Sequence, residues 1–95
     1  MATKTKADSD HLGMVSASGC IVCRNEFGLH SEAECHHIGN GTMGKRSSHR
    51  DAIALCPMHH RLGGIGVAIH SGRKSFESNF GTERELLAQT LELLK

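Results

Sequence analysis

The chain has 95 residues, enough for one domain, and it has only three Phe and neither Trp nor Tyr to fill a core. Four Cys and eight His are many for this length, while the net charge of +1 is too small to indicate a nucleic-acid partner by itself. The first ten residues contain no apolar run and no segment is long enough to span a membrane, which disfavours a secreted disulfide scaffold and a membrane protein. We therefore expect a cytoplasmic domain that is stabilised by metal.

The first half of the chain predicts an arm followed by two strands. Residues 1–17 are small and polar without apolar periodicity, and they predict a flexible arm ahead of one domain over residues 18–95. Residues 34–38 and 51–55 predict two short strands, and the glycine-rich segment 39–44 predicts a loop between them.

The second half of the chain predicts three helices. Pro57 suits the first position of a short helix, which Gly63 would end. Residues 71–80 predict a second short helix. Thr82 and Glu85 have the spacing of a capping box and predict the start of a C-terminal helix. The apolar face of that helix would be formed by Leu86, Leu87, Leu91 and Leu94.

Two short motifs predict a structural zinc site of the knuckle type. Cys20 and Cys23 form a CxxC pair, and Cys56 and His59 form a CxxH pair, so each turn supplies two ligands for one tetrahedral ion. The long gap between the pairs means that metal binding would close a loop across a small fold. The alternative is a set of reduced, buried cysteines without metal, which two half-sites make less favourable. Cys35 is left over; it could substitute as a ligand, but a buried thiol is the preferred interpretation.

A His-His pair is the second feature with chemical meaning. Neighbouring residues of a strand point to opposite faces, so His36 could hold a metal while His37 addresses another target. On the following helix, His59 and His60 would differ by about 100° around the axis, which directs His60 away from the zinc site. His36 and His60 as ligands of a divalent cation, with His37 as general base, would suit phosphodiester cleavage. The alternative is that some of these histidines complete the structural site or are solvated.

Positive charge is concentrated in the middle of the chain. Residues 45–74 contain six Lys or Arg and a single acid, Asp51. This distribution is typical of a phosphate-binding surface, although an ordinary solvated surface explains the charges equally well if they are taken alone. The residues that we expect to contact a nucleic-acid backbone are Lys45, Arg46, His49, Arg50, Arg73 and Lys74.

The order of these motifs resembles the ββα-metal, or HNH, nucleases. Those proteins have a His-His strand, a loop, and a second strand that ends in L-C-x-x-[CH]-H on a helix. The resemblance implies that His36 and His60 are ligands of the catalytic metal and that His37 is the general base. Asp51 stands where the family has its middle Asn, and it would orient His37 or join the metal.

A longer set of matches, over roughly residues 18–94, resembles the phage Ref family of recombination-enhancement nucleases. The matching segments are residues 36–38, 44–49, 55–60, 69–70, 76–77, 81–83 and 86–87. The resemblance implies a DNA endonuclease that acts with RecA filaments. His49 and His70 also fall in matched positions, and we expect them to line the cleft and contact phosphate or water.

The sequence thus predicts a small zinc-stabilised α+β domain of the ββα-metal type with additional C-terminal helices. The expected function is metal-dependent cleavage of DNA with little sequence preference, in phage recombination or DNA processing inside a bacterial host. The catalytic metal would be Mg²⁺, Mn²⁺ or Zn²⁺. One alternative is a zinc-stabilised module that binds nucleic acid without cutting it. Another is a structural zinc domain that binds protein.

Overall fold

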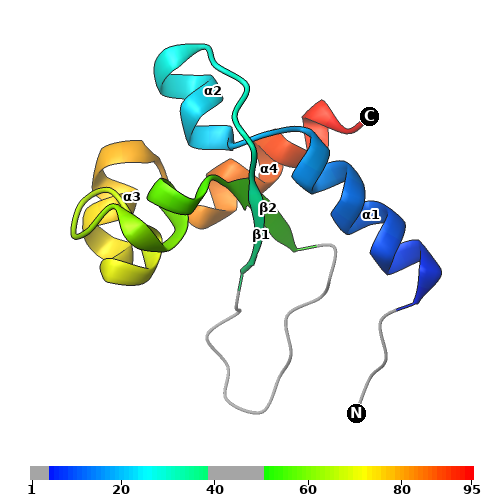
Figure 1. The fold of residues 1–95 in the computed structure, drawn as a ribbon, viewed down its shortest axis with the longest axis horizontal. Helices are drawn as coiled ribbons and strands as arrows, with labels where there is room; N and C mark the ends of the chain where they lie inside the picture. The colour runs from blue at the N-terminus through cyan, green and yellow to red at the C-terminus, as the bar shows by residue number, and fades with distance from the viewer. Residues whose placement is uncertain (1–4, 39–50) are drawn as a thin grey trace.

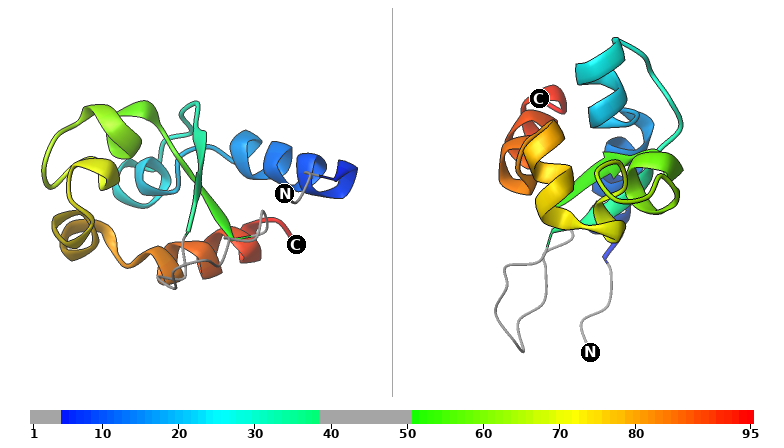
Figure 2. Two further views of the ribbon diagram at one scale, coloured as in Figure 1. Left: turned by 90° about the horizontal axis from the view of Figure 1, so that it is seen from below. Right: turned by 90° about the vertical axis from the view of Figure 1, so that its left-hand side faces the viewer.

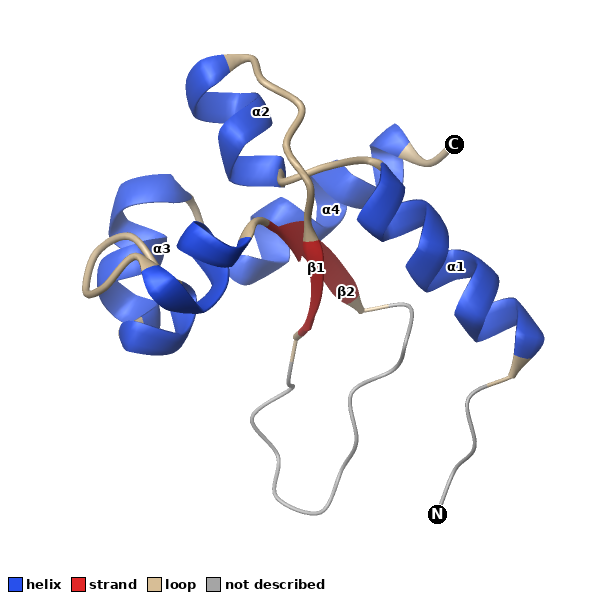
Figure 3. Ribbon diagram, viewed as in Figure 1, coloured by secondary structure: helices blue, strands red, loops and turns tan. Residues whose placement is uncertain are grey.

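The computed structural model describes residues 5–38 and 51–95. In these residues a two-stranded sheet is surrounded by helices and helical turns (Figures 1 and 3). In chain order the elements are α1 (Lys6–Ala17), α2 (Ile21–Phe27), β1 (Glu34–His37), β2 (Ala52–Leu55), η1 (Met58–Leu62), η2 (Ile69–Ser71), α3 (Arg73–Phe80) and α4 (Glu83–Leu93). The two predicted strands are confirmed, and so are the helical segments predicted after Pro57, before Gly81 and after Thr82. The predicted glycine-rich loop lies outside the described residues.

The N-terminal segment differs from the expected flexible arm, because residues 6–17 form helix α1. A capping box begins this helix: Asp8 N–H donates to the Thr5 hydroxyl at 3.0 Å, and Thr5 N–H donates to the Asp8 carboxylate at 3.1 Å. His11 and Val15 are buried one helical turn apart, and α1 contacts both strands. The sequence shows no broad apolar face here, and the helix instead docks through a narrow strip that includes one polar and one apolar buried side chain, His11 and Val15.

Strands β1 and β2 pair in antiparallel fashion, with His36 opposite Ile53 and His37 opposite Ala52. All four residues of β2 are buried, because α1, α2 and α4 all pack against this strand. Figure 2 shows α4 on one side of the strands and crossing their direction, while α1 extends away from them. In β1, His36 is 9% exposed whereas its neighbour His37 is exposed, as strand alternation requires.

The core lies between the sheet, α2 and the C-terminal helices. Its largest buried apolar side chains include Ile21, Val22, Ile38, Ile53, Leu55 and Phe76. Three cysteines, Cys20, Cys23 and Cys56, belong to the same buried cluster. A core this small leaves room for a metal site to contribute a large part of the stability.

Helix α4 begins at the capping box that the sequence predicts. Glu85 N–H donates to the Thr82 hydroxyl at 3.1 Å, and Thr82 N–H donates to the Glu85 carboxylate at 2.8 Å. Leu86 and Leu87 are buried, while Leu91 is 39% exposed, so the apolar face of α4 is shorter than expected. No helix in the described part of the chain has the length and apolar character needed to cross a bilayer.

Candidate functional site

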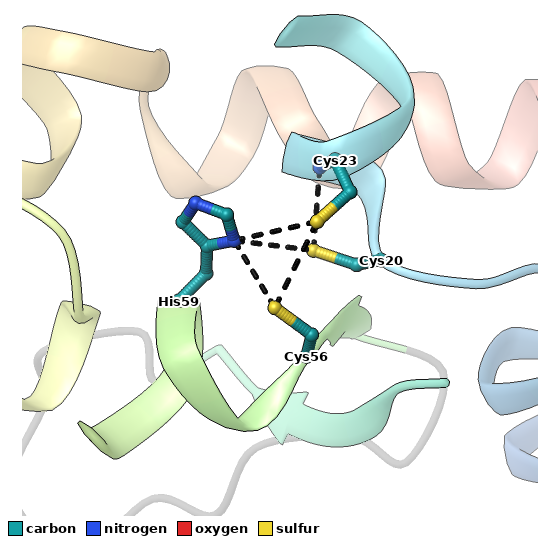
Figure 4. A group of neighbouring side chains, drawn as sticks. All are labelled: Cys20, Cys23, Cys56 and His59. Atoms are coloured by element: carbon teal, nitrogen blue, oxygen red, sulfur yellow. Dashed lines mark hydrogen bonds between the residues drawn. The ribbon is translucent and has the colours of Figure 1, made fainter. Parts of the chain in front are cut away.

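Three cysteines and a histidine meet at the junction of α2, β2 and η1 (Figure 4). Cys20 caps the N-terminus of α2, where its sulfur accepts a hydrogen bond from Cys23 N–H at 3.4 Å. Cys56 directly follows β2, and His59 lies in η1. The Nδ1 atom of His59 is 3.1–3.7 Å from the three sulfurs, and the sulfurs of Cys23 and Cys56 are 3.8 Å apart. We refer to these four residues as the Cys3His cluster.

The spacing within the Cys3His cluster fits a tetrahedral metal ion. Bonds of about 2.3 Å to sulfur and about 2.0 Å to nitrogen separate ligand atoms at tetrahedral corners by about 3.5–3.8 Å. All four side chains are buried, so such a site would be closed to solvent. Burial raises the pKa of the Cys20 thiol to about 12, which leaves the thiol neutral until a cation offsets the cost of the buried thiolate.

The helical turn η1 sends its two histidines in different directions. This turn is wound as a π-helix, in which Gly63 N–H donates to the Met58 carbonyl at 2.9 Å. His59 faces the sulfurs of the Cys3His cluster, and burial lowers its pKa, which favours the neutral imidazole that can act as a ligand. His60 instead faces β1 and η2. The divergence expected from the sequence is therefore present.

A second possible metal site consists of His36, His60 and His70, which we call the histidine trio. One nitrogen from each ring lies within 4.8 Å of the others, and Nε2 of His60 is 3.0 Å from Nε2 of His70. Burial lowers the pKa of His36, which again favours a neutral imidazole. His70 is exposed, so the histidine trio opens to solvent on one side, as a catalytic site must.

Two carboxylates that the sequence analysis missed lie against the histidine trio. Glu83 accepts a hydrogen bond from Nε2–H of His36 at 2.7 Å, and Glu34 accepts one from Nδ1–H of His60 at 2.8 Å. Arg61 forms two further bonds to Glu34, and these bonds, with that from His60, lower the pKa of this carboxyl to about 2. Strand alternation could have identified Glu34, because it lies on the same face of β1 as His36.

The structure describes the positions of the other predicted catalytic residues, His37, Asp51 and His70. His37 is the exposed neighbour of His36 at the end of β1. Asp51 lies 3.9 Å from Arg84, and it belongs to neither group of possible metal ligands found among the described residues. His70, which the sequence analysis could only place at the cleft, proves to be a member of the histidine trio.

The predicted basic contacts are only partly described. Arg73 and Lys74 are exposed at the start of α3, and Arg73 approaches Glu83 to 3.9 Å. This ion pair places one predicted contact beside the histidine trio. The remaining predicted contacts lie outside the described residues; they are Lys45, Arg46, His49 and Arg50.

The fourth cysteine lies apart from the Cys3His cluster. Cys35 is half-buried in β1, and its thiol donates to the Leu12 carbonyl of α1 at 3.3 Å. The possible metal site thus uses the other three cysteines, as the spacing predicts.

Comparison with known protein families gives one match over nearly the whole chain. A family model described as "Recombination enhancement, RecA-dependent nuclease" matches residues 4–95. None of the curated proteins matches the chain. The matched range contains both groups of possible metal ligands and also helix α1.

Proposed function

The chain belongs to the family of recombination-enhancement, RecA-dependent nucleases, and we propose that it is a metal-dependent DNA endonuclease of the ββα-metal, or HNH, type. The main support is the pairing of a closed Cys3His cluster with an open histidine trio, joined by the neighbouring residues His59 and His60. Two antiparallel strands followed by a ligand-bearing helical turn also agree with the ββα order. The activity would serve phage recombination or DNA processing in the cytoplasm of a bacterial host.

The Cys3His cluster has a structural role in this proposal. Thiolate and imidazole donors in a closed tetrahedral arrangement favour Zn²⁺. Such an ion would tie α2 to the turn that follows β2, and it would fix the direction of η1. The cluster would thereby hold His60 beside the other two members of the histidine trio, His36 and His70.

In this proposal the histidine trio binds the catalytic metal and His37 is the general base. His36, His60 and His70 would hold a divalent cation, with Mg²⁺, Mn²⁺ and Zn²⁺ as the candidates. Such a cation neutralises charge on a phosphodiester and on its departing oxygen. His37, exposed beside His36, would accept the proton of the attacking water as general base.

The DNA would be held mainly through its phosphates. Arg73 and Lys74 are exposed at the start of α3, and Arg73 approaches Glu83. We assign both to backbone contacts, together with the predicted basic residues of the segment before β2. Backbone contacts carry little sequence information, and they release counterions on binding. The proposal therefore includes weak sequence preference and binding that weakens steeply with salt.

Nicking of supercoiled plasmid, with and without RecA filaments, tests the proposed function. The wild-type protein should cut in the presence of Mg²⁺ or Mn²⁺, and His37→Ala and His36→Ala should each reduce the rate by at least about 100-fold. His30→Ala is the matched control, because His30 is exposed and its ring contacts the Ala17 carbonyl. If His37→Ala cuts as fast as wild type, His37 is not the general base.

A binding module without nuclease activity is the second candidate. Asp51 pairs with Arg84 although it stands where HNH nucleases have Asn, and this observation favours a scaffold that has lost its chemistry. This candidate predicts tight DNA binding and no cleavage with any divalent metal, whether or not RecA filaments are present. That result would replace the endonuclease proposal.

A further inference from the structure

We propose that Glu34 and Glu83 are positioning residues, each of which accepts an N–H of one imidazole and thereby fixes which of its nitrogens is left unprotonated for the metal. The inference rests on the proposed function, in which the histidine trio holds a divalent cation. A histidine ligand must present an unprotonated nitrogen to the ion, and the hydrogen bond made by its other nitrogen selects that tautomer.

Glu34 has the geometry to set the tautomer of His60. Its carboxylate accepts from Nδ1–H of His60 at 2.8 Å, so Nε2 of this ring is the unprotonated nitrogen, and it lies 3.0 Å from Nε2 of His70. Neutral histidine in water favours the opposite tautomer, with its proton on Nε2. In the absence of Glu34, the proton on Nε2 of His60 would point at Nε2 of His70.

Arg61 fixes the position of the Glu34 carboxylate. Its Nε and Nη2 atoms donate to the two oxygens of Glu34 at 3.0 and 2.8 Å, which is a bidentate pair. Because Arg61 follows His60 directly in η1, a single carboxylate on β1 holds two consecutive residues of this turn. The ring of His60 is thereby constrained in orientation as well as in tautomer.

Glu83 provides the corresponding contact for His36 from a distant part of the chain. Its carboxylate accepts from Nε2–H of His36 at 2.7 Å, and both side chains are about nine-tenths buried. Glu83 is the first residue of α4, where the Thr82 capping box and a bond from Glu83 N–H to Glu77 hold the backbone. The C-terminal helix is therefore part of the site and does more than cover the core.

The first test reads the tautomer of His60 and needs neither DNA nor a catalytic metal. The protein is labelled at its histidine nitrogens, loaded with one equivalent of Zn²⁺ and studied by NMR above neutral pH. The His60 signals are identified because they are lost in His60→Ala. We expect protonated Nδ1 in wild type and in the charge-matched control Glu32→Ala, whose side chain is exposed. Glu34→Ala should shift the proton to Nε2, and an unchanged tautomer in this variant would overturn the inference.

The second test measures binding of Co²⁺ to the zinc-loaded protein by calorimetry. Loss of an outer carboxylate typically weakens metal binding about 10–100-fold, and we expect this for both Glu34→Ala and Glu83→Ala. Glu83→Gln retains an acceptor oxygen and should recover part of the affinity. The control is Glu85→Gln, which weakens the cap of the same helix without touching His36. Equal losses in Glu85→Gln and Glu83→Ala would show that only helix stability matters and would overturn the role of Glu83.

These readouts separate the positioning role from the proposed function. In one outcome the wild-type protein fails to cut DNA, while its Co²⁺ affinity and its His60 tautomer still depend on the two carboxylates. That result would contradict the proposed nuclease function and support the positioning role. The opposite result is a wild-type protein that cuts DNA and whose Glu34→Ala and Glu83→Ala variants bind Co²⁺ as tightly as wild type does. That result would contradict only the positioning role.

Discussion

His59 and His60 are consecutive in the chain, yet their rings belong to different clusters. Nδ1 of His59 lies 3.1 Å from the sulfur of Cys56, and Nε2 of His60 lies 3.0 Å from Nε2 of His70. The wide π-turn of η1 supports both directions at once. The two groups of possible metal ligands are thus linked through a single peptide unit.

Substitution of these two neighbours should separate stability from activity. His59→Ala removes a ligand of the Cys3His cluster, and we expect it to lower the free energy of unfolding by at least about 3 kcal/mol, as loss of a metal does in small domains. His60→Ala should change stability far less and abolish plasmid nicking. Urea unfolding and nicking assays on the two variants provide the measurements. The same unfolding midpoint for both variants would contradict this division of roles.

The cysteines offer a matched pair for testing the structural metal. Cys23→Ser should lose the zinc and unfold largely, because metal binding contributes about 10–16 kcal/mol in zinc-finger peptides and the whole stability of a domain is about 5–15 kcal/mol. Cys35→Ser should retain one zinc per chain, since Cys35 bonds to the Leu12 carbonyl instead. Metal analysis together with circular dichroism measures both effects. Zinc loss in Cys35→Ser would contradict the assignment of the ligands.

The Cys3His cluster could be predicted from the sequence because both of its half-sites are local. Cys20 and Cys23 come from one turn, and Cys56 and His59 come from another. The spacing within each pair alone therefore brings its two ligands together. The two strands could also be predicted, because each is a short segment that is recognisable from its own residues and from the glycine-rich segment between them. In each case the local pattern agrees with the packing of the fold.

The surroundings of the histidine trio depend on contacts between distant residues. Glu83 is 47 residues from His36, and no spacing rule connects them. His70 reaches the trio only because η2 packs against η1. Helix α1 was missed for a related reason, since the side chains that dock it, such as Val15, form too narrow a strip to produce a periodic pattern. Tertiary packing supplies this information.

The capping box of α4 should produce an acid-sensitive contribution to stability. Bonds from the Thr82 backbone and side chain lower the pKa of Glu85 below its ordinary value of 4.5. A carboxyl with a depressed folded pKa stabilises the fold above its unfolded pKa, and this contribution is lost as pH falls from about 4.5 through the folded pKa. Glu85→Gln should therefore be less stable than wild type at neutral pH, and the difference should shrink in acid. Urea titrations at several pH values measure it.

Thr82→Ala removes the other half of the same capping box. The substitution should cost about 1 kcal/mol, which corresponds to a decrease in Tm of roughly 4–8 °C for a domain of this size. Unlike the effect of Glu85→Gln, this loss should persist in acid, because the hydroxyl of Thr82 still accepts from Glu85 N–H when the carboxyl is protonated. A cost that disappears at low pH would mean that the hydroxyl acts only through the carboxylate.

Helix α1 should contribute to the stability of the whole domain through Val15, which is fully buried. Val15→Ala deletes two methyl groups from a packed site, and we expect a loss of about 1–3 kcal/mol from lost burial and the remaining cavity. Met14→Ala is the matched control, because Met14 is 50% exposed on the same helix and its truncation should change stability by less than about 0.5 kcal/mol. Urea unfolding curves give both changes in the free energy of unfolding from their midpoints, provided that the variants and the wild type have equal m-values. If Val15→Ala unfolds at the wild-type midpoint, α1 is not docked in solution and the segment behaves as the flexible arm expected from the sequence.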